Sequence, residues 1–225
     1  MKFRMITTFF GAHSFGGDAA YVDRLSQALC RRGHEVHVYY CVDAFNAVRG
    51  DHPLRSYTPP PGLHLHPLKS GAGILSPLAT QATGLPLFKT AELREALDDP
   101  ATDVVHFHNI SLVGGPGVLG LGTNRRAVRI MTAHEHWLIC PMHLLWKYDR
   151  EPCTAASCVS CCLRGRRPPL KQQLTQFGAA QGSRSYFQRR CIGQINQCSC
   201  AVMIRTARRF VPRPRTPGPP MSEIL

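Results

Sequence analysis

The sequence predicts an α/β fold with an open, doubly wound parallel sheet, because short apolar runs alternate with helical segments. An apolar run at residues 2–10 is followed by a glycine-containing segment, 11–17, which indicates a buried strand and a loop. Apolar residues then recur at three- and four-residue spacing over 18–32, which predicts an amphipathic helix. Residues 35–40 supply a second strand. This order is typical of a right-handed parallel βαβ unit.

The later elements follow the same alternation. They comprise an edge strand at 63–66, a helix at 91–97, a strand at 103–108, a short helix at 117–121 and a strand at 129–133. From 41 to 88 the pattern is interrupted by Pro59-Pro60-Pro61-Gly62, so we expect only loops there besides the edge strand.

Composition limits the class of protein. With 225 residues, 44% of them hydrophobic, the chain can bury one substantial core. Its apolar runs are shorter than the roughly 20 residues of a membrane helix, and we recognise no export signal, so we expect a cytoplasmic protein. Most of the net charge of +13 lies late in the chain, where residues 151–225 hold 12 Lys and Arg against two Asp and Glu. We therefore expect a domain over 1–170 and a disordered basic tail, rich in Pro and Arg, over 171–225.

Cysteines give the strongest metal signal. Eight of the ten lie after residue 139, and reduced thiols are the default in the cytoplasm. Four thiolates in the Cys-rich segment 140–162 could close a tetrahedral shell around a structural zinc ion: Cys140, Cys153, Cys158 and Cys161. An iron–sulfur cluster needs the same ligands, and reduced cysteines in a plain loop are the alternative to any metal.

Ligands of an open α/β sheet bind at the carboxyl ends of its strands. There, Gly16 and Gly17 precede a helix, whose N-terminal amides favour an anion or a sugar hydroxyl. The segment lacks the residues that define a dinucleotide fingerprint or a P-loop, and a tight turn that uses glycine for packing is the alternative.

Two other strand ends carry histidines. His106, His108 and Asn109 end one strand, and strand alternation places the two histidines on the same face. His134, Glu135 and His136 end another. These side chains could form a zinc site, provide a general base or bind sugar hydroxyls, and the simpler alternative is a set of hydrogen-bonded polar residues at the sheet edge. The spacing of His134 and His136 does not match the H-E-x-x-H of metalloproteases.

Three stretches together resemble the N-terminal domain of family 4 retaining glycosyltransferases of the GT-B fold. They are G-G-D-A-A-Y-V at 16–22 with R-G-H-E-V at 32–36, D-V-V-H-F-H-N at 103–109, and T-A-H-E-H-W at 132–137. The resemblance covers about residues 1–165 and implies a Rossmann-like N-terminal half of that fold. Residues 137–161 are similar to a cysteine-containing insertion in a subgroup of these enzymes.

The resemblance implies transfer of a sugar from a nucleotide-sugar donor to a carbohydrate, lipid or small-molecule acceptor, with retention and no obligatory cofactor. Gly16 and Gly17 match the glycine loop that faces the donor phosphates. His134, or His108 as second choice, matches the histidine near the transferred sugar, and Asn109 and Glu135 accompany them in substrate binding. Contact with the inner face of the membrane stays open.

The family's second domain carries an E-x7-E motif, which does not occur after residue 151. We therefore expect a truncated or frameshifted product without activity on its own. The alternative function is a metal-stabilised basic module that binds nucleic acid or a partner protein. The tail has few aromatic residues and no known nucleic-acid-binding module, so we do not favour nucleic acid.

Overall fold

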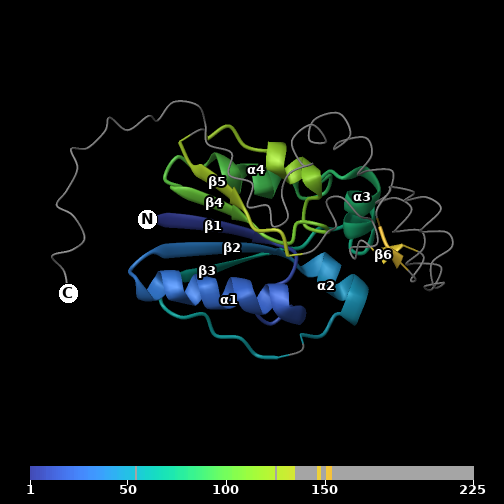
Figure 1. Cartoon of the computed structure of the whole chain (residues 1–225), viewed down its shortest axis with the longest axis horizontal. Helices are drawn as coiled ribbons and strands as arrows, with labels where there is room; N and C mark the ends of the chain where they lie inside the picture. Colours follow the sequence, from blue (N-terminus) through green and yellow to red (C-terminus); the bar gives the residue numbers. More distant parts are fainter. Residues whose placement is uncertain (54, 125, 135–145, 148–150, 154–225) are drawn as a thin grey trace.

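The computed structural model describes residues 1–53, 55–124, 126–134, 146–147 and 151–153. Five parallel strands form one sheet in the order β3-β2-β1-β4-β5 (Figure 1). The strands are β1 (Lys2–Thr7), β2 (Glu35–Cys41), β3 (Leu63–Leu68), β4 (Val104–Phe107) and β5 (Val128–Met131). The helices are α1 (Gly16–Arg31), α2 (Val42–Arg49), α3 (Leu75–Thr83), α4 (Thr90–Asp98) and the 3-10 helix η1 (Pro116–Gly120). A separate antiparallel pair comprises β6 (Trp146–Lys147) and β7 (Glu151–Pro152).

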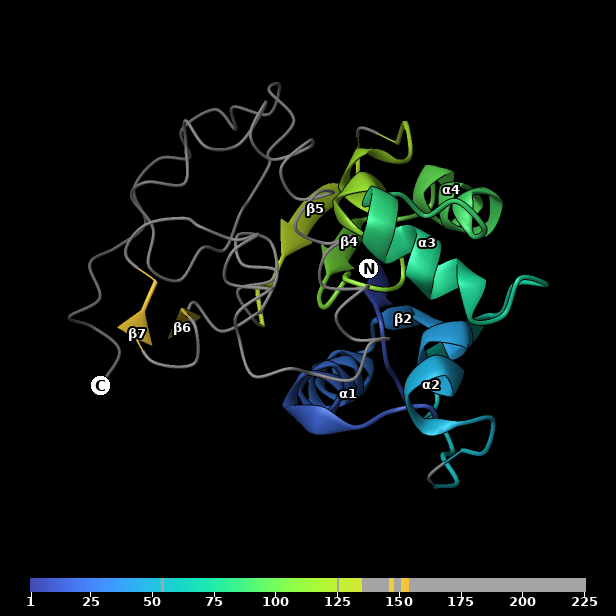
Figure 2. The ribbon, with the colours of Figure 1, turned by 90° about the vertical axis from the view of Figure 1, so that its right-hand side faces the viewer.

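Helices cover both faces of the sheet, as Figures 1 and 2 show, with α1 on one face and α3 and α4 on the other. Alternate strand residues supply the two cores. Met5, Val36 and Val38 pack with Val22 of α1. On the opposite face, Ile6, Val105 and Phe107 pack with residues of α4, namely Leu93, Ala96 and Leu97. The predicted α/β fold with a doubly wound parallel sheet is therefore confirmed.

The strand order creates a switch point. From β1 the chain adds β2 and then β3 on one side, and it returns to add β4 and β5 on the other. The connections that leave β1 and β4 therefore diverge in opposite directions. In this class of fold, a crevice for ligands opens at the carboxyl ends of two such strands.

The segment between residues 41 and 88 contains two helices, so the expectation of loops there was wrong. Helix α2 begins directly at the end of β2, where the Cys41 thiol accepts a hydrogen bond from the Ala44 amide. Helix α3 contains Pro77 in its first turn and no charged residue, so it lacks the usual amphipathic pattern. The strand β3 lies at the sheet edge, as predicted.

The bounds of several helices and strands also differ from those predicted. Helix α1 begins at Gly16 rather than residue 18, so both glycines lie in its first turn and not in the preceding loop. The strand predicted at 2–10 ends at Thr7, and the one predicted at 129–133 covers Val128–Met131. The tail, 171–225, and most of the Cys-rich segment lie outside the described residues. None of the helices in the described part of the chain has the length and apolar character to span a bilayer.

The glycine-rich loop before η1 packs tightly on the end of α3. The Gly117 amide donates a hydrogen bond to the Gly84 carbonyl at 2.7 Å. At Gly115, where φ is +59°, an added Cβ would lie 2.7 Å from the Gly84 backbone. Glycine here permits the approach of two backbones, which fixes the position of the segment that follows β4.

Candidate functional site

A hydrogen-bond network joins the carboxyl ends of β1 and β4 to the N-terminus of α1. Its centre is Asn109, whose Nδ2 donates to Asp18 Oδ2 at 2.9 Å and whose Oδ1 accepts from Ser111 Oγ at 2.7 Å. Thr8 Oγ1, from the end of β1, donates to the Asn109 carbonyl at 2.8 Å. These bonds hold polar side chains at the switch point.

The N-terminus of α1 is open on the side of the two glycines. Gly16 and Gly17 are both exposed, and a Cβ added at Gly17 would have no atom within 4 Å. Asp18 Oδ1 accepts a hydrogen bond from the Ala19 amide, so this helix end already carries a carboxylate. A second anion would be repelled by Asp18, whereas a hydroxyl could donate to it. The local geometry therefore favours the sugar hydroxyl over the anion.

Three histidines follow the network at the ends of β4 and β5. His108 Nδ1 lies 3.2 Å from His134 Nε2, and His106 Nε2 lies 2.8 Å from Thr132 Oγ1. The His106 and His108 rings have their centroids 4.0 Å apart, which confirms that the two side chains share a face. Tyr21 of α1, itself 46% exposed, lies beside this group, with its ring centroid 5.2 Å from that of His134.

Burial keeps the imidazoles at β4 uncharged. It lowers the pKa of His106 to about 4, and neighbouring His134 adds to the effect. His108 is 1% exposed, and burial, reinforced by His106 and His134, holds its pKa well below the ordinary 6.5. At neutral pH, both groups are therefore hydrogen-bonding imidazoles rather than cations.

His108 Nε2 is buried without a hydrogen-bond partner among the described residues. If Nδ1 accepts from His134, the proton of His108 is on Nε2 and can be donated to a ligand. In the other tautomer, Nε2 can accept from a hydroxyl. A buried polar atom without a partner costs about 1–3 kcal/mol, so a ligand oxygen placed there would be stabilised.

The structure brings together most of the predicted sugar-site residues. Gly16, Gly17, His108, Asn109 and His134 lie at the carboxyl edge of the sheet or at the adjacent end of α1. Glu135 and His136 are outside the described residues, as are three of the predicted zinc ligands, Cys140, Cys158 and Cys161. Cys153, the fourth, is partly buried directly after β7.

Sequence reasoning missed four residues of this site. Asp18 and Tyr21 lie within the stretch 16–22 that carries the family resemblance, but no role at the site was predicted for them. No role was predicted for Thr8 or Ser111 either. Their roles depend on the contact between β1, α1 and the loop after β4, which are far apart in the sequence.

A zinc site was one interpretation of the strand-end histidines. Among the described residues, these histidines do not form a set of three ligand atoms that lie close together. The one such set there is formed by Glu35, His37 and His64, on β2 and β3.

Comparison with protein-family models gave a match to a glycosyl transferase 4-like domain over residues 16–185. The matched range begins at the first residue of α1 and includes β2 to β5. It also includes the three strand-end histidines, His106, His108 and His134. Comparison with curated proteins gave no match.

Proposed function

The chain belongs to the glycosyl transferase 4-like family, and we propose that its described sheet forms the acceptor-side half of a site that transfers a sugar from a nucleotide-sugar donor. The observation that carries this proposal is the Asn109 network. It places a carboxylate, an amide and two hydroxyls at the carboxyl edge of the sheet, next to neutral imidazoles. Such hydrogen-bond donors and acceptors, with no positive charge among them, suit the hydroxyls of a sugar.

In the proposed reaction, the bond between the anomeric carbon and the donor diphosphate breaks, and an acceptor hydroxyl oxygen bonds to that carbon with retention. The acceptor hydroxyl proton passes to the departing diphosphate oxygen, and the nucleotide leaves as the diphosphate. Asp18 and His108 would orient hydroxyls, and His134, beside the exposed ring of Tyr21, would contact the transferred sugar. Positioning of this kind supplies much of the rate of group transfer. We propose no cofactor for this step.

The donor diphosphate needs positive charge or several amides, and none of the described side chains in the Asn109 network or the histidine group is Lys or Arg. We therefore propose that residues outside this group hold the diphosphate. On this proposal the 225-residue chain alone turns over no nucleotide-sugar, because the described group by itself does not hold the diphosphate.

The test uses the chain alone and the chain fused to the C-terminal domain of an active family member, each incubated with a panel of nucleotide-sugars and acceptors. Product would be detected by mass spectrometry. We expect no product from the chain alone and product from the fusion. In the fusion, His134→Ala and His108→Ala should each reduce kcat/KM at least about tenfold, the loss of roughly one good hydrogen bond. The exposed His52→Ala is the control.

Robust transfer by the chain alone would contradict the half-site proposal. A fusion that is fully active with both histidine substitutions would remove the residue assignment but would leave the family membership intact.

Exposed apolar side chains favour a lipid acceptor or a peripheral membrane contact. They lie on α3 and in the segment that follows it: Ile74, Leu75, Leu78, Leu85, Leu87 and Phe88. Figure 1 places α3 at the end of the sheet toward which the strands run. Sedimentation with anionic lipid vesicles tests this contact, and Leu87→Ser with Phe88→Ser should weaken it. Unchanged sedimentation of that variant would exclude this surface.

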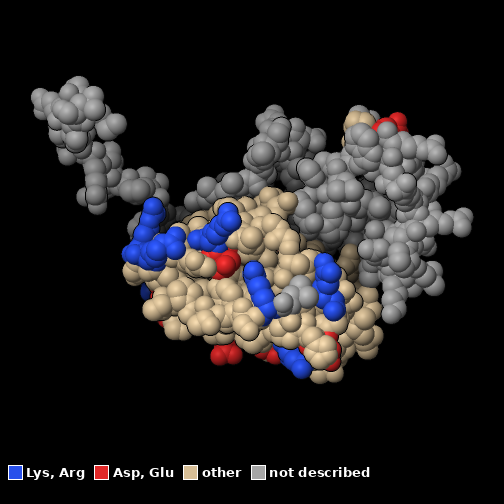
Figure 3. Space-filling view, turned by 90° about the horizontal axis from the view of Figure 1, so that it is seen from below, with Lys and Arg blue, Asp and Glu red and all other residues tan. Residues whose placement is uncertain are grey.

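The alternative, a basic module for nucleic acid, gains no support from the face seen in Figure 3, which includes no continuous basic surface. On the part of that face that is described, Lys and Arg side chains lie apart, with Asp, Glu and uncharged residues between them.

A further inference from the structure

A second polar cluster lies on β2 and β3, away from the strand-end group. Glu35 and His37 are two residues apart on β2, so their side chains share a face, and His37 is paired in register with His64 of β3. The three side chains differ in exposure: that of His37 is 12% exposed, that of Glu35 48% and that of His64 52%. The cluster is therefore anchored at His37 and open to solvent at its other two members.

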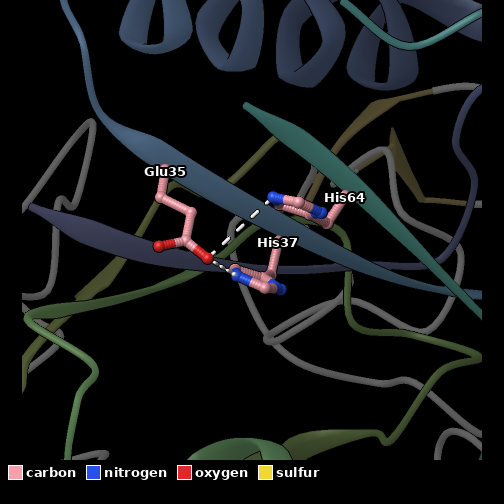
Figure 4. A group of neighbouring side chains, drawn as sticks. All are labelled: Glu35, His37 and His64. Atoms are coloured by element: carbon pink, nitrogen blue, oxygen red, sulfur yellow. Dashed lines mark hydrogen bonds and ion pairs between the residues drawn. The ribbon is translucent and has the colours of Figure 1, made fainter. Parts of the chain in front are cut away.

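The ligand atoms of the cluster converge. Glu35 Oε1 lies 2.8 Å from His37 Nε2 and 3.9 Å from His64 Nε2, and one ligand atom from each residue lies within 4.8 Å of the other two. Figure 4 shows both imidazoles directed at the same carboxylate oxygen. Ligands about 2.0–2.1 Å from a tetrahedral zinc ion are about 3.3 Å apart, so small side-chain movements bring these atoms to coordination distance.

A hydrogen bond behind the cluster orients the His37 ring. His37 Nδ1 lies 2.9 Å from His66 Nε2, and the His66 ring stacks on Tyr39 with a centroid distance of 4.3 Å. Without metal, the 2.8 Å contact between His37 Nε2 and Glu35 Oε1 is a hydrogen bond that the ring nitrogen donates. On metal binding, Nε2 would give its lone pair to the ion, and Nδ1 would carry the proton and donate it to His66 Nε2. Metal-binding histidines commonly donate their second ring N–H in this way.

Two cations lie near the cluster, Arg4 and Lys2, and Arg4 is paired with Asp99. Lys2 Nζ is 3.9 Å from Glu35 Oε1 and 3.3 Å from Asp99 Oδ2, so it has a second, closer carboxylate partner. A metal ion on Glu35 would leave Lys2 paired with Asp99. Without metal, Glu35 thus keeps a hydrogen bond with His37 and an ion pair with Lys2.

We propose that Glu35, His37 and His64 bind one Zn²⁺ ion, with water in the remaining position, and that the ion links the edge strand β3 to β2. Two imidazoles and one carboxylate are a common ligand set for this ion. The proposal is independent of sugar transfer, because none of its residues contacts the Asn109 network or the strand-end histidines in the described structure.

The test measures Zn²⁺ bound by the full chain in equilibrium dialysis, with thiols kept reduced. Because cysteines bind zinc too, the readout is the difference between variants. His64→Ala and Glu35→Gln should each bind about one equivalent less than the wild type, and His52→Ala, at an exposed histidine beside Asp51, should bind the same amount. His64 and Glu35 are exposed enough that neither substitution should affect folding.

A second readout separates this site from thiol sites. Addition of Zn²⁺ should shift the ring nitrogen and proton NMR signals of His37 and His64 in the wild type and leave those of His52 in place. Equal zinc binding by all variants, or imidazole signals that do not move, would overturn the proposal. Neither outcome would bear on glycosyl transfer.

Discussion

The neutral histidines predict that the folded chain is sensitive to acid. Burial is the main reason that the pKa values of His66 and His106 fall from 6.5 to about 4. Between these values, the unfolded chain binds a proton at each position and the folded chain does not. Protons therefore favour unfolding, and the free energy of unfolding decreases as the pH falls from about 6.5 toward 4.

The size of the effect follows from the same pKa values. A pH of 5 is about 1.5 units below 6.5, and each unit is worth about 1.4 kcal/mol for each histidine that stays neutral on folding. His66 and His106 should each cost about 2 kcal/mol at that pH, or about 4 kcal/mol together. His108 acts in the same direction. Against a total stability of about 5–15 kcal/mol, this loss is large.

Urea unfolding of the full chain, followed by circular dichroism at pH 7 and pH 5 with a chelator present, measures the loss. In His106→Gln, where the amide can still bond to Thr132, the difference between the two pH values should shrink by about 2 kcal/mol. His52→Gln, at a side chain that is 94% exposed, is the control. A free energy of unfolding that is the same at both pH values, or a His106→Gln variant that loses as much as the wild type, would refute this reasoning.

Three further predictions concern packing and metal. Asn109→Ala removes the side-chain hydrogen bonds that Asn109 makes with Asp18, Ser111 and Thr8, and it should lower the free energy of unfolding by about 2 kcal/mol in urea titrations; an unchanged value would mean that water replaces them. Gly115→Ala, with positive φ and a backbone contact, should cost about 1–3 kcal/mol, whereas Gly71→Ala has open space and should change the same measurement by less than about 0.5 kcal/mol. The Cys-rich segment should bind about one zinc ion, so Cys153→Ser should lower the zinc content found by metal analysis and Cys30→Ser should not; equal contents would contradict the cysteine site.

Sequence patterns were sufficient for the sheet but insufficient for helices α2 and α3. Four strands were predicted because buried parallel strands are apolar runs, the edge strand β3 because Leu63 and Leu65 alternate with histidines, and α1 because Val22 and Leu25 repeat at helical spacing. Helix α2 has only eight residues, and its start depends on a thiol acceptor at Cys41. Helix α3 packs through Ser76, Pro77, Thr80 and Gln81, which are not residues that a hydrophobic pattern detects.

The sequence predicts the position of those site residues that directly follow a strand. It does not predict contacts between site residues that are far apart in the sequence. His108, Asn109 and His134 follow apolar runs, so their place at the carboxyl edge follows from the fold class alone. The bond between Asp18 and Asn109 joins residues 91 positions apart, and no local pattern encodes it. The pairing of His37 with His64 likewise depends on the register between β2 and β3. The alternation of residues within one strand does not specify this register.

On the proposed function, the charges of the strand-end histidines and of Asp18 bear on which part of a nucleotide-sugar this site would bind. The imidazoles of His106 and His108 stay neutral, and Asp18 places a carboxylate at the one helix end that would otherwise attract phosphate. A diphosphate brought to this edge would meet negative charge without compensation from the side chains of the group, whereas a sugar hydroxyl would find both donors and acceptors. On the proposed function, recognition of the sugar and recognition of the diphosphate therefore require different surfaces, and the proposal assigns the first to the described sheet.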